Sequence, residues 1–194
     1  MKRLIQSTAA LALAIVVGAC AGDTTPDETT ATGTGGTVGT SGDIAADRDF
    51  LEEQLAMGTA EIELGRLAQQ RAQHADVKEF GAMMVQHHQT AAEELRPIAS
   101  RAAGGQAPQA ADLDDHRDLM EELSQLSGAD FDKKYIQEMI DDHQEGIGDL
   151  EGKAENAADP DVKAWAARAL PTMRQHLERA KSIKETLDRA GTNY

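Results

Sequence analysis

Four polar side chains that can bind a metal ion stand at positions where an apolar residue is expected. They are one carboxylate and three imidazoles: Glu61, His88, His143 and His176. Each lies on the apolar stripe of a different predicted helix and is therefore predicted to face the interior. Carboxylate oxygens and imidazole nitrogens bind Zn, Cu and Fe in proteins. The four positions predict a metal site inside a helical bundle.

The separation of these residues from the predicted turns places them at similar heights. Glu61 precedes the first turn and His88 follows it, at about 21 and about 20 Å along the helix axis, for a rise of about 1.5 Å per residue. His143 and His176 flank the second turn at about 24 and about 26 Å. If the two helix pairs pack in register, the carboxylate and the three imidazoles meet in one interior layer.

A metal-free interpretation of the same residues is also open. A single core histidine is usually neutral and hydrogen-bonded to a carbonyl or a water, and a buried Glu/His network would use all four side chains. Four uncompensated polar groups in an alanine- and leucine-rich core are costly, however, and one metal ion compensates them together. We therefore favour a metal site.

The spacing argues against a dinuclear iron centre. Such a centre uses Glu-x-x-His on two helices, whereas Val85, Ile140 and Met173 stand three residues before the three histidines. A mononuclear site of three histidines and one glutamate fits better. The residue types do not choose between Cu, Zn and Fe.

Methionines and further histidines stand near these positions. Four methionines lie about one turn before the four residues of the layer: Met57, Met84, Met139 and Met173. Thioethers beside imidazoles favour copper, although filling gaps in the core is the more usual role of methionine. His74 and His87 are expected outside the layer, and His116 is expected to face inward on a short helix.

Five helices are expected to position these residues. They are predicted at about 49–73, 76–98, 110–126, 130–154 and 160–187. Asp76 and Glu79 form a capping-box pattern, Asp130 can cap the fourth helix, and Asp159 followed by Pro160 is typical of a helix start. Pro171 is expected to kink the last helix. The predicted fold is all-α, a ferritin-like four-helix bundle with one extra short helix.

The composition agrees with helices and excludes other classes. The 194 residues carry a formal net charge of −15 and only 3% are aromatic, whereas strands of sandwiches and barrels are rich in aromatic and β-branched residues. A chain this acidic repels the phosphate groups of a nucleic-acid backbone. Nucleic-acid binding is therefore not expected. A single cysteine allows neither an internal disulfide nor a cysteine-rich zinc module.

The N-terminal residues have the pattern of a lipoprotein signal. A basic start is followed by an apolar run, and Val17-Gly18-Ala19-Cys20 ends it as a small-residue cleavage site. Residues 1–19 are predicted to be removed and Cys20 to be lipidated, and Ala21 after the cysteine favours the outer membrane. The alternative is a transmembrane anchor, but the run is shorter than the ~18 to 20 residues that a span needs.

Residues 20–45 are rich in threonine and glycine and contain almost nothing apolar. Such a segment cannot bury enough surface to offset its ordering entropy. We expect a flexible tether that holds the bundle, residues 46–194, away from the membrane on the periplasmic side.

Four segments of the chain resemble one family of bacterial envelope proteins. They are AEIELGRLA at 60–68, VKEFGAMMVQHH at 77–88, LSGADFDKKYIQEMIDDH at 126–143 and LPTMRQHL at 170–177. The chain resembles the domain of unknown function 4142 family over about residues 49–187. This resemblance implies a ferritin-like bundle, an envelope address and a metal site of undefined role. The family's glutamate and histidines match the four residues of the layer, whereas His87 stands where the family usually has aspartate.

Three functions fit these features. The first is an envelope lipoprotein that binds a transition metal for storage, buffering or stress protection. The second is a redox or hydrolytic metalloenzyme with an open coordination position at the same site. The third is a structural or interaction bundle with a buried Glu/His network and no metal. The expected partners are a metal ion and the membrane, through the lipid anchor.

Overall fold

A computed structural model of the chain describes residues 41–105 and 114–191. Within these ranges it contains five helices and no strand: α1 (Ser41–Arg71), α2 (Ala75–Ala102), α3 (Asp114–Gln125), α4 (Gly128–Asn156) and α5 (Pro160–Gly191). The predicted all-α class is confirmed. The predicted signal peptide, the lipidation site and most of the predicted tether lie outside the described residues. No described helix is long and apolar enough to cross a bilayer.

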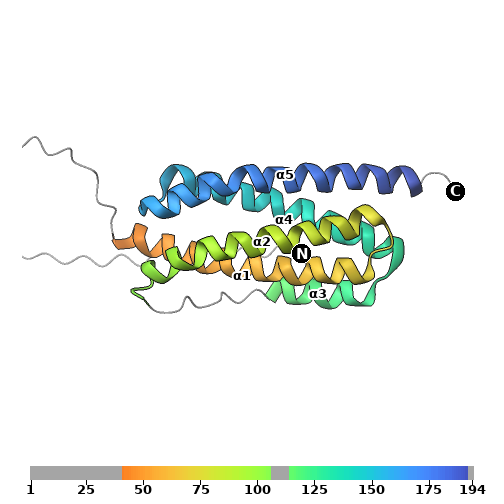
Figure 1. Cartoon of the computed structure of the whole chain (residues 1–194), viewed down its shortest axis with the longest axis horizontal. Helices are drawn as coiled ribbons and strands as arrows, with labels where there is room; N and C mark the ends of the chain where they lie inside the picture. Colours follow the sequence, from red (N-terminus) through yellow and green to blue (C-terminus); the bar gives the residue numbers. More distant parts are fainter. Residues whose placement is uncertain (1–40, 106–113, 192–194) are drawn as a thin grey trace, which may run out of the picture. The chain divides into compact units, whose positions relative to one another are not determined.

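The four long helices form two antiparallel hairpins, α1–α2 and α4–α5, which pack along each other (Figure 1). The closest packing is within each hairpin, and contacts between α2 and α5 and between α1 and α4 join the two. The short helix α3 lies against α1 and α4. The architecture is therefore the predicted four-helix bundle with one extra helix.

The starts of the helices differ in detail from those predicted. α1 begins at Ser41 rather than near Asp49, so the last part of the predicted tether is helical. At the start of α2, Nδ1 of His74 accepts a hydrogen bond from the backbone N–H of Asp76 at 3.2 Å, in place of the predicted capping box. The residue before α4 is Ser127, and Asp130 lies within the first turn.

Helix α5 has a capping residue at its start and a proline within it. At its start, the carboxylate of Asp159 accepts a hydrogen bond from the backbone N–H of Asp161 at 2.7 Å, as predicted for a capping residue. Farther along, α5 continues through Pro171 to its end without interruption.

A buried aspartate near the start of each hairpin holds the turn of the other hairpin. Asp132 of α4 accepts hydrogen bonds from the backbone N–H groups of Gln73, at 3.0 Å, and His74, at 2.8 Å. Asp47 of α1 accepts one from the backbone N–H of Asp159, at 2.8 Å. These bonds satisfy backbone donors that the helix ends leave unpaired. Asp47 is itself buried and precedes the apolar stripe of α1, so this helix is anchored ahead of that stripe.

The aromatic contacts between the hairpins also form two matching pairs, as the two buried aspartates do. Phe50 of α1 meets Trp165 of α5 edge to face at a centroid distance of 6.3 Å, and Tyr135 of α4 meets Phe80 of α2 in the same manner at 6.2 Å. The difference in residue number between Phe50 and Tyr135 equals that between Phe80 and Trp165. The two buried aspartates, Asp47 and Asp132, differ by the same number of residues. The two hairpins are therefore related by an approximate twofold repeat.

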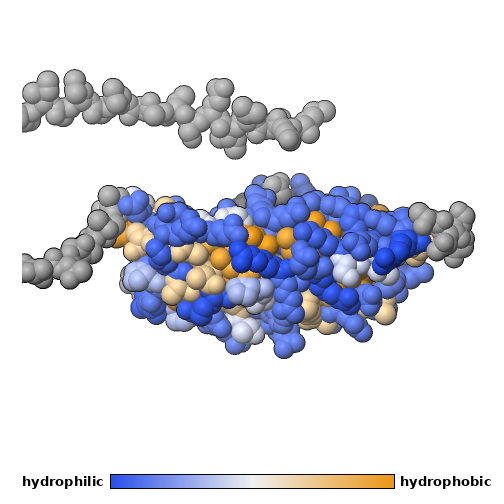
Figure 2. Space-filling view, turned by 90° about the horizontal axis from the view of Figure 1, so that it is seen from above, coloured by the Kyte–Doolittle hydropathy of each residue, from blue (hydrophilic) through white to orange (hydrophobic). Residues whose placement is uncertain are grey.

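The interior consists of two apolar clusters. The first includes Leu64, Phe80, Met84, Tyr135, Ile140 and Leu177. The second includes Leu51, Leu95, Leu150, Trp165 and Ala166. On each long helix, the polar residue of the predicted layer falls between members of the two clusters, so the layer crosses the middle of the core. The outer face drawn in Figure 2 is mostly hydrophilic, with smaller hydrophobic areas between.

Candidate metal centre

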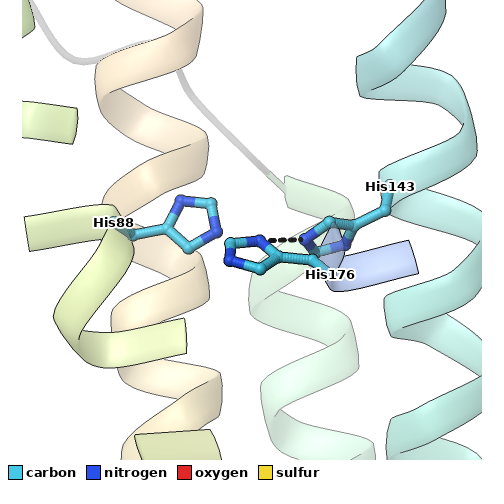
Figure 3. A group of neighbouring side chains, drawn as sticks. All are labelled: His88, His143 and His176. Atoms are coloured by element: carbon cyan, nitrogen blue, oxygen red, sulfur yellow. Dashed lines mark hydrogen bonds between the residues drawn. The ribbon is translucent and has the colours of Figure 1, made fainter. Parts of the chain in front are cut away.

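Three histidines from three helices converge between the two apolar clusters (Figure 3). His88 lies on α2, His143 on α4 and His176 on α5, and one ring nitrogen of each lies within 4.8 Å of the other two. His143 and His176 are each 1% exposed, and His88 is half-buried. The structure thus brings together the three histidines that the sequence placed in one layer, and we call them the histidine cluster.

Hydrogen bonds determine which nitrogens of the cluster carry a proton. Nδ1 of His143 lies 2.8 Å from the backbone carbonyl of Met139, which can only accept, so Nδ1 donates and Nε2 is left as an acceptor. Nε2 of His143 lies 3.1 Å from Nδ1 of His176, which then donates to it. Nε2 of His176 is therefore an acceptor in turn, and this chain of bonds is consistent with neutral imidazoles.

The pKa values of the three rings agree with neutral imidazoles. Burial, reinforced by the neighbouring histidines, lowers the pKa of His88 to about 3 and the pKa of His176 to about 2. Burial also lowers the pKa of His143 to about 4, although its bond to the Met139 carbonyl acts in the opposite direction. An imidazole binds a metal through a nitrogen that carries no proton. The neutral rings therefore need only a change of tautomer at His176, where the proton moves from Nδ1 to Nε2 and Nδ1 of His87 accepts the hydrogen bond.

Glu61 lies beside the histidine cluster rather than within it. Its side chain is buried on α1 with 4% exposure, but no carboxylate oxygen belongs to the group of atoms within 4.8 Å of one another. Burial, and to a smaller extent the negative charge of Asp142, raise the pKa of Glu61 to about 8. Glu61 and His88 line the same cavity.

Five buried side-chain atoms have no hydrogen-bond partner among the described residues. Two of them, Oε2 of Glu61 and Nε2 of His88, belong to residues that line the cavity, and the others are on His116, Tyr135 and Asp142. A buried polar atom without a partner is costly, and such atoms in native proteins usually mark a bound water, an ion or a functional group. The donor types and the unpaired atoms therefore fit a transition-metal ion.

The prediction that His87 lies outside the layer is wrong. Nδ1 of His87 lies 2.7 Å from Nε2 of His176, and the two rings stack at a centroid distance of 5.0 Å. The apolar stripe predicts only the direction of a side chain from its own helix, whereas contact also depends on how close α5 packs. The adjacent pair His87-His88 was the signal in the sequence for a second histidine at the layer.

The remaining histidines are not part of the cluster. His74 caps α2 at the turn and lies outside the layer. His116 of α3 lies near α4, where its Nε2 is 4.0 Å from a carboxylate oxygen of Asp142. Neither belongs to the group of ring nitrogens that lie close together.

The four methionines near the layer divide into two pairs. Met84 and Met139 are fully buried in the first apolar cluster, where they fill the core. Met57 and Met173 are half-buried and line the cavity beside the histidine cluster. Of the four methionines, only this second pair lines the cavity.

Together, the fold and the site define an all-α bundle with a cluster of neutral histidines in its core. The family model described as "Domain of unknown function (DUF4142)" matches residues 33–183. The chain belongs to this family. No curated protein sequence gives a significant match.

Solved structures of CopM have the same fold. The Cu(I)-bound form matches with a TM-score of 0.62 and 16% identity, over 72% of this chain and 96% of that chain. The apo form matches with a TM-score of 0.60 and the Ag-bound form with 0.59, each at 18% identity and with the same coverage. At this level of identity the similarity extends to the fold alone.

Proposed function

We propose that this protein binds a transition-metal ion through His88, His143 and His176, with Glu61 as a further ligand, for storage, buffering or stress protection in the bacterial envelope. The observation that carries the proposal is the convergence of three ring nitrogens within 4.8 Å in the core. The lowered pKa values of the three rings support it, because ligation requires unprotonated nitrogens.

The surrounding residues orient the proposed ligands. The hydrogen bond from Nδ1 of His143 to the Met139 carbonyl orients this ring and leaves its Nε2 without a proton, so that a metal ion there would replace the hydrogen bond that Nε2 accepts from His176. For Nδ1 of His176 to bind the metal, the proton of this ring would lie on Nε2, from which Nδ1 of His87 can accept a hydrogen bond. Such partners of ligating histidines strengthen metal binding by holding the ring in place.

Glu61 has a role that depends on the ion. As a buried carboxyl it keeps its proton up to a pH of about 8, because burial raises its pKa. A cation nearby stabilises the carboxylate and lowers its pKa, so Glu61 supplies a negative charge where the metal charge needs compensation.

Copper is the ion to test first, with Zn and Fe as the other candidates. Two observations support this order. CopM has Cu(I)-bound and Cu(II)-bound structures with the same fold, and Met57 and Met173 offer thioether sulfur at the cavity beside the cluster.

The envelope address is also part of the proposal. It is supported by the lipoprotein signal pattern at residues 1–19 and by Cys20 as the lipid attachment residue. With Ala21 after the cysteine, we propose an outer-membrane lipoprotein whose bundle faces the periplasm. Fractionation of cells that express the wild type or Cys20→Ser tests it, since only the wild type should remain with the membranes.

Metal titration of protein purified without a histidine tag tests the proposed site. We expect one equivalent of Cu(II), Zn(II) or Fe(II) per chain, measured by calorimetry and metal analysis. His88→Ala, His143→Ala and His176→Ala should each weaken binding by more than about tenfold, since even loss of a partner of a ligand costs about 10- to 100-fold. His74→Ala is the control and should bind as the wild type does. If all variants bind equally, or no metal binds, the cluster is a metal-free hydrogen-bond network.

A further inference from the structure

A cavity of about 400 Å³ adjoins the histidine cluster on one side. Its walls include Leu95 of α2, Leu150 of α4 and Trp165 of α5, which belong to the second apolar cluster. Its inner end is formed by Glu61, His87, His88 and His176. The volume lies in the range of about 300 to 1,000 Å³ that is typical of small-molecule sites.

The cavity exists because the twofold repeat of the hairpins is broken at the layer. The difference in residue number between Phe50 and Tyr135 pairs each residue of the layer with a counterpart in the other hairpin. The counterpart of His143 is Gly58, that of His176 is Ala91, that of His88 is Met173 and that of Glu61 is Gly146. All four counterparts line the cavity. Gly58 and Ala91 are small, so the space that His143 and His176 fill on one side stays open on the other. At Gly146 an added Cβ would come within 3.1 Å of Cε of Met173, which takes up that space. A side chain at Gly58 is not excluded by crowding, because an added Cβ would only come within 3.9 Å of the His88 ring.

The lining of the cavity defines the chemistry of its occupant. The exposed lining residues mark its mouth: Thr90, Glu94, Arg168 and Gln175. Between the mouth and the cluster the walls are mainly apolar, and the buried atoms without partners, on Glu61 and His88, belong to residues of the inner end. The cavity therefore fits a small molecule with an apolar part the size of one ring, which packs against the walls, and one polar atom, which reaches the polar inner end.

We infer that this cavity binds a small organic molecule whose apolar body packs against Trp165 and whose single nitrogen or oxygen donor reaches the metal ion at the histidine cluster. The second part of this inference, the contact between the donor atom and the metal ion, rests on the proposed function. The inference implies that the metal ion keeps one coordination position open for this class of ligand. A closed storage site would not need such a position.

Trp165 provides a direct readout of the cavity. It is the only tryptophan of the chain, and it is 4% exposed in the cavity wall. We choose 4-phenylimidazole as the probe, because its phenyl ring supplies the apolar body and its imidazole nitrogen the donor. The full chain is titrated with the probe while Trp165 fluorescence is followed, first without metal and then with Zn(II), which does not quench by electron transfer.

The expected result is a saturable change of Trp165 fluorescence that needs about tenfold less probe when Zn(II) is bound. Imidazole alone, which lacks the apolar body, should bind at least about tenfold more weakly, because burial of a ring-sized apolar surface contributes more than about 1.4 kcal/mol. Ala169→Leu fills the cavity wall and should weaken probe binding by about tenfold or more while Zn(II) binding is retained. Its control is Ala164→Leu, at an exposed position of the same helix.

Ala91→Leu repeats the test from α2, with Ala82→Leu at an exposed position of that helix as its control. Circular dichroism establishes that each variant is folded. Absence of saturable binding, or equal binding by the wall variants and the wild type, overturns the inference. Equal affinity with and without Zn(II) overturns the contact with the metal.

Zinc binding is measured on the same samples by calorimetry, which separates this inference from the proposed function. If Zn(II) binds and the probe does not, the cavity site is wrong and the metal site stands. If the probe binds and none of Zn(II), Cu(II) and Fe(II) does, the metal function and the contact with the metal are wrong, and the cavity site stands.

Discussion

Nδ1 of His87 lies 2.7 Å from Nε2 of His176, and the two rings are nearly parallel, with an interplanar angle of 15°. The contact joins α2 to α5 at the edge of the histidine cluster. It uses one nitrogen of His176, while the other faces His143 at 3.1 Å. The orientation of His176 is therefore determined from both sides.

His87→Ala is expected to weaken metal binding by about 10- to 100-fold, because it removes the partner that orients His176. The loss should be smaller than that caused by His176→Ala, which removes a proposed ligand. Calorimetric titration with Cu(II) measures both, and His74→Ala, at the distant turn, is the control. A loss as large as that of His176→Ala would make His87 itself a ligand.

The stability of the metal-free protein is expected to fall as the pH drops from 6.5 towards 4. Burial lowers the pKa of His88 to about 3, so below pH 6.5 the unfolded chain takes up a proton that the folded chain does not. Above pH 6.5 the ring is neutral in both states and this loss is absent.

Urea unfolding of the wild type and of His88→Gln between pH 7 and pH 4 measures this effect. The free energy of unfolding of the variant should fall less steeply, by up to about 1.4 kcal/mol per pH unit. No described hydrogen bond is lost in this variant, since Nε2 of His88 has no partner. Parallel curves for the two proteins would show that His88 does not titrate with folding.

Glu61→Gln is expected to stabilise the metal-free protein more at pH 8 than at pH 5. The pKa of Glu61 is raised from 4.5 to about 8, so its stabilising contribution is complete below pH 4.5 and is lost as the pH rises to 8. Glutamine keeps the shape without this titration.

The measurement is urea unfolding of both proteins at the two pH values, in the presence of a chelator. Glu63→Gln, at an exposed position of the same helix, is the control for the loss of one carboxylate from α1. A gain from Glu61→Gln that is equal at pH 5 and pH 8 would contradict a raised pKa in the folded protein.

Gly65→Ala is expected to destabilise the bundle by roughly 1 to 3 kcal/mol. A Cβ at Gly65 would lie 2.6 Å from the carbonyl oxygen of Gly81, and one at Gly81 would lie 2.7 Å from the carbonyl oxygen of Gly65. The two backbones of the first hairpin therefore pack too closely for any side chain. Thermal or urea unfolding measures the loss.

Gly148→Ala is the matched control, since a Cβ there meets no atom within 4 Å and the residue is helical and exposed. It should stabilise by about 0.5 to 1 kcal/mol, the usual preference for alanine over glycine in a helix. Similar effects of the two substitutions would contradict close packing at Gly65.

The number of helices, their order and the height of the polar layer follow from the sequence alone. Apolar periodicity defines the face of each helix, and the count of residues from the turns defines the height of each side chain along it. Both are local properties, which is why His88, His143 and His176 were placed in one layer before any contact between helices was considered.

The tertiary structure decided which side chains of that layer touch. His87 joined His176, and Glu61 remained beside the cluster, because contact depends on the distance and rotation between helices from different hairpins. The burial of Asp47, ahead of the apolar stripe of α1, depends on a bond to a turn more than a hundred residues away in sequence. The cavity likewise required both hairpins in place, since it is the space that small residues of one hairpin leave opposite the other. Periodicity along a single helix contains no information about these distances.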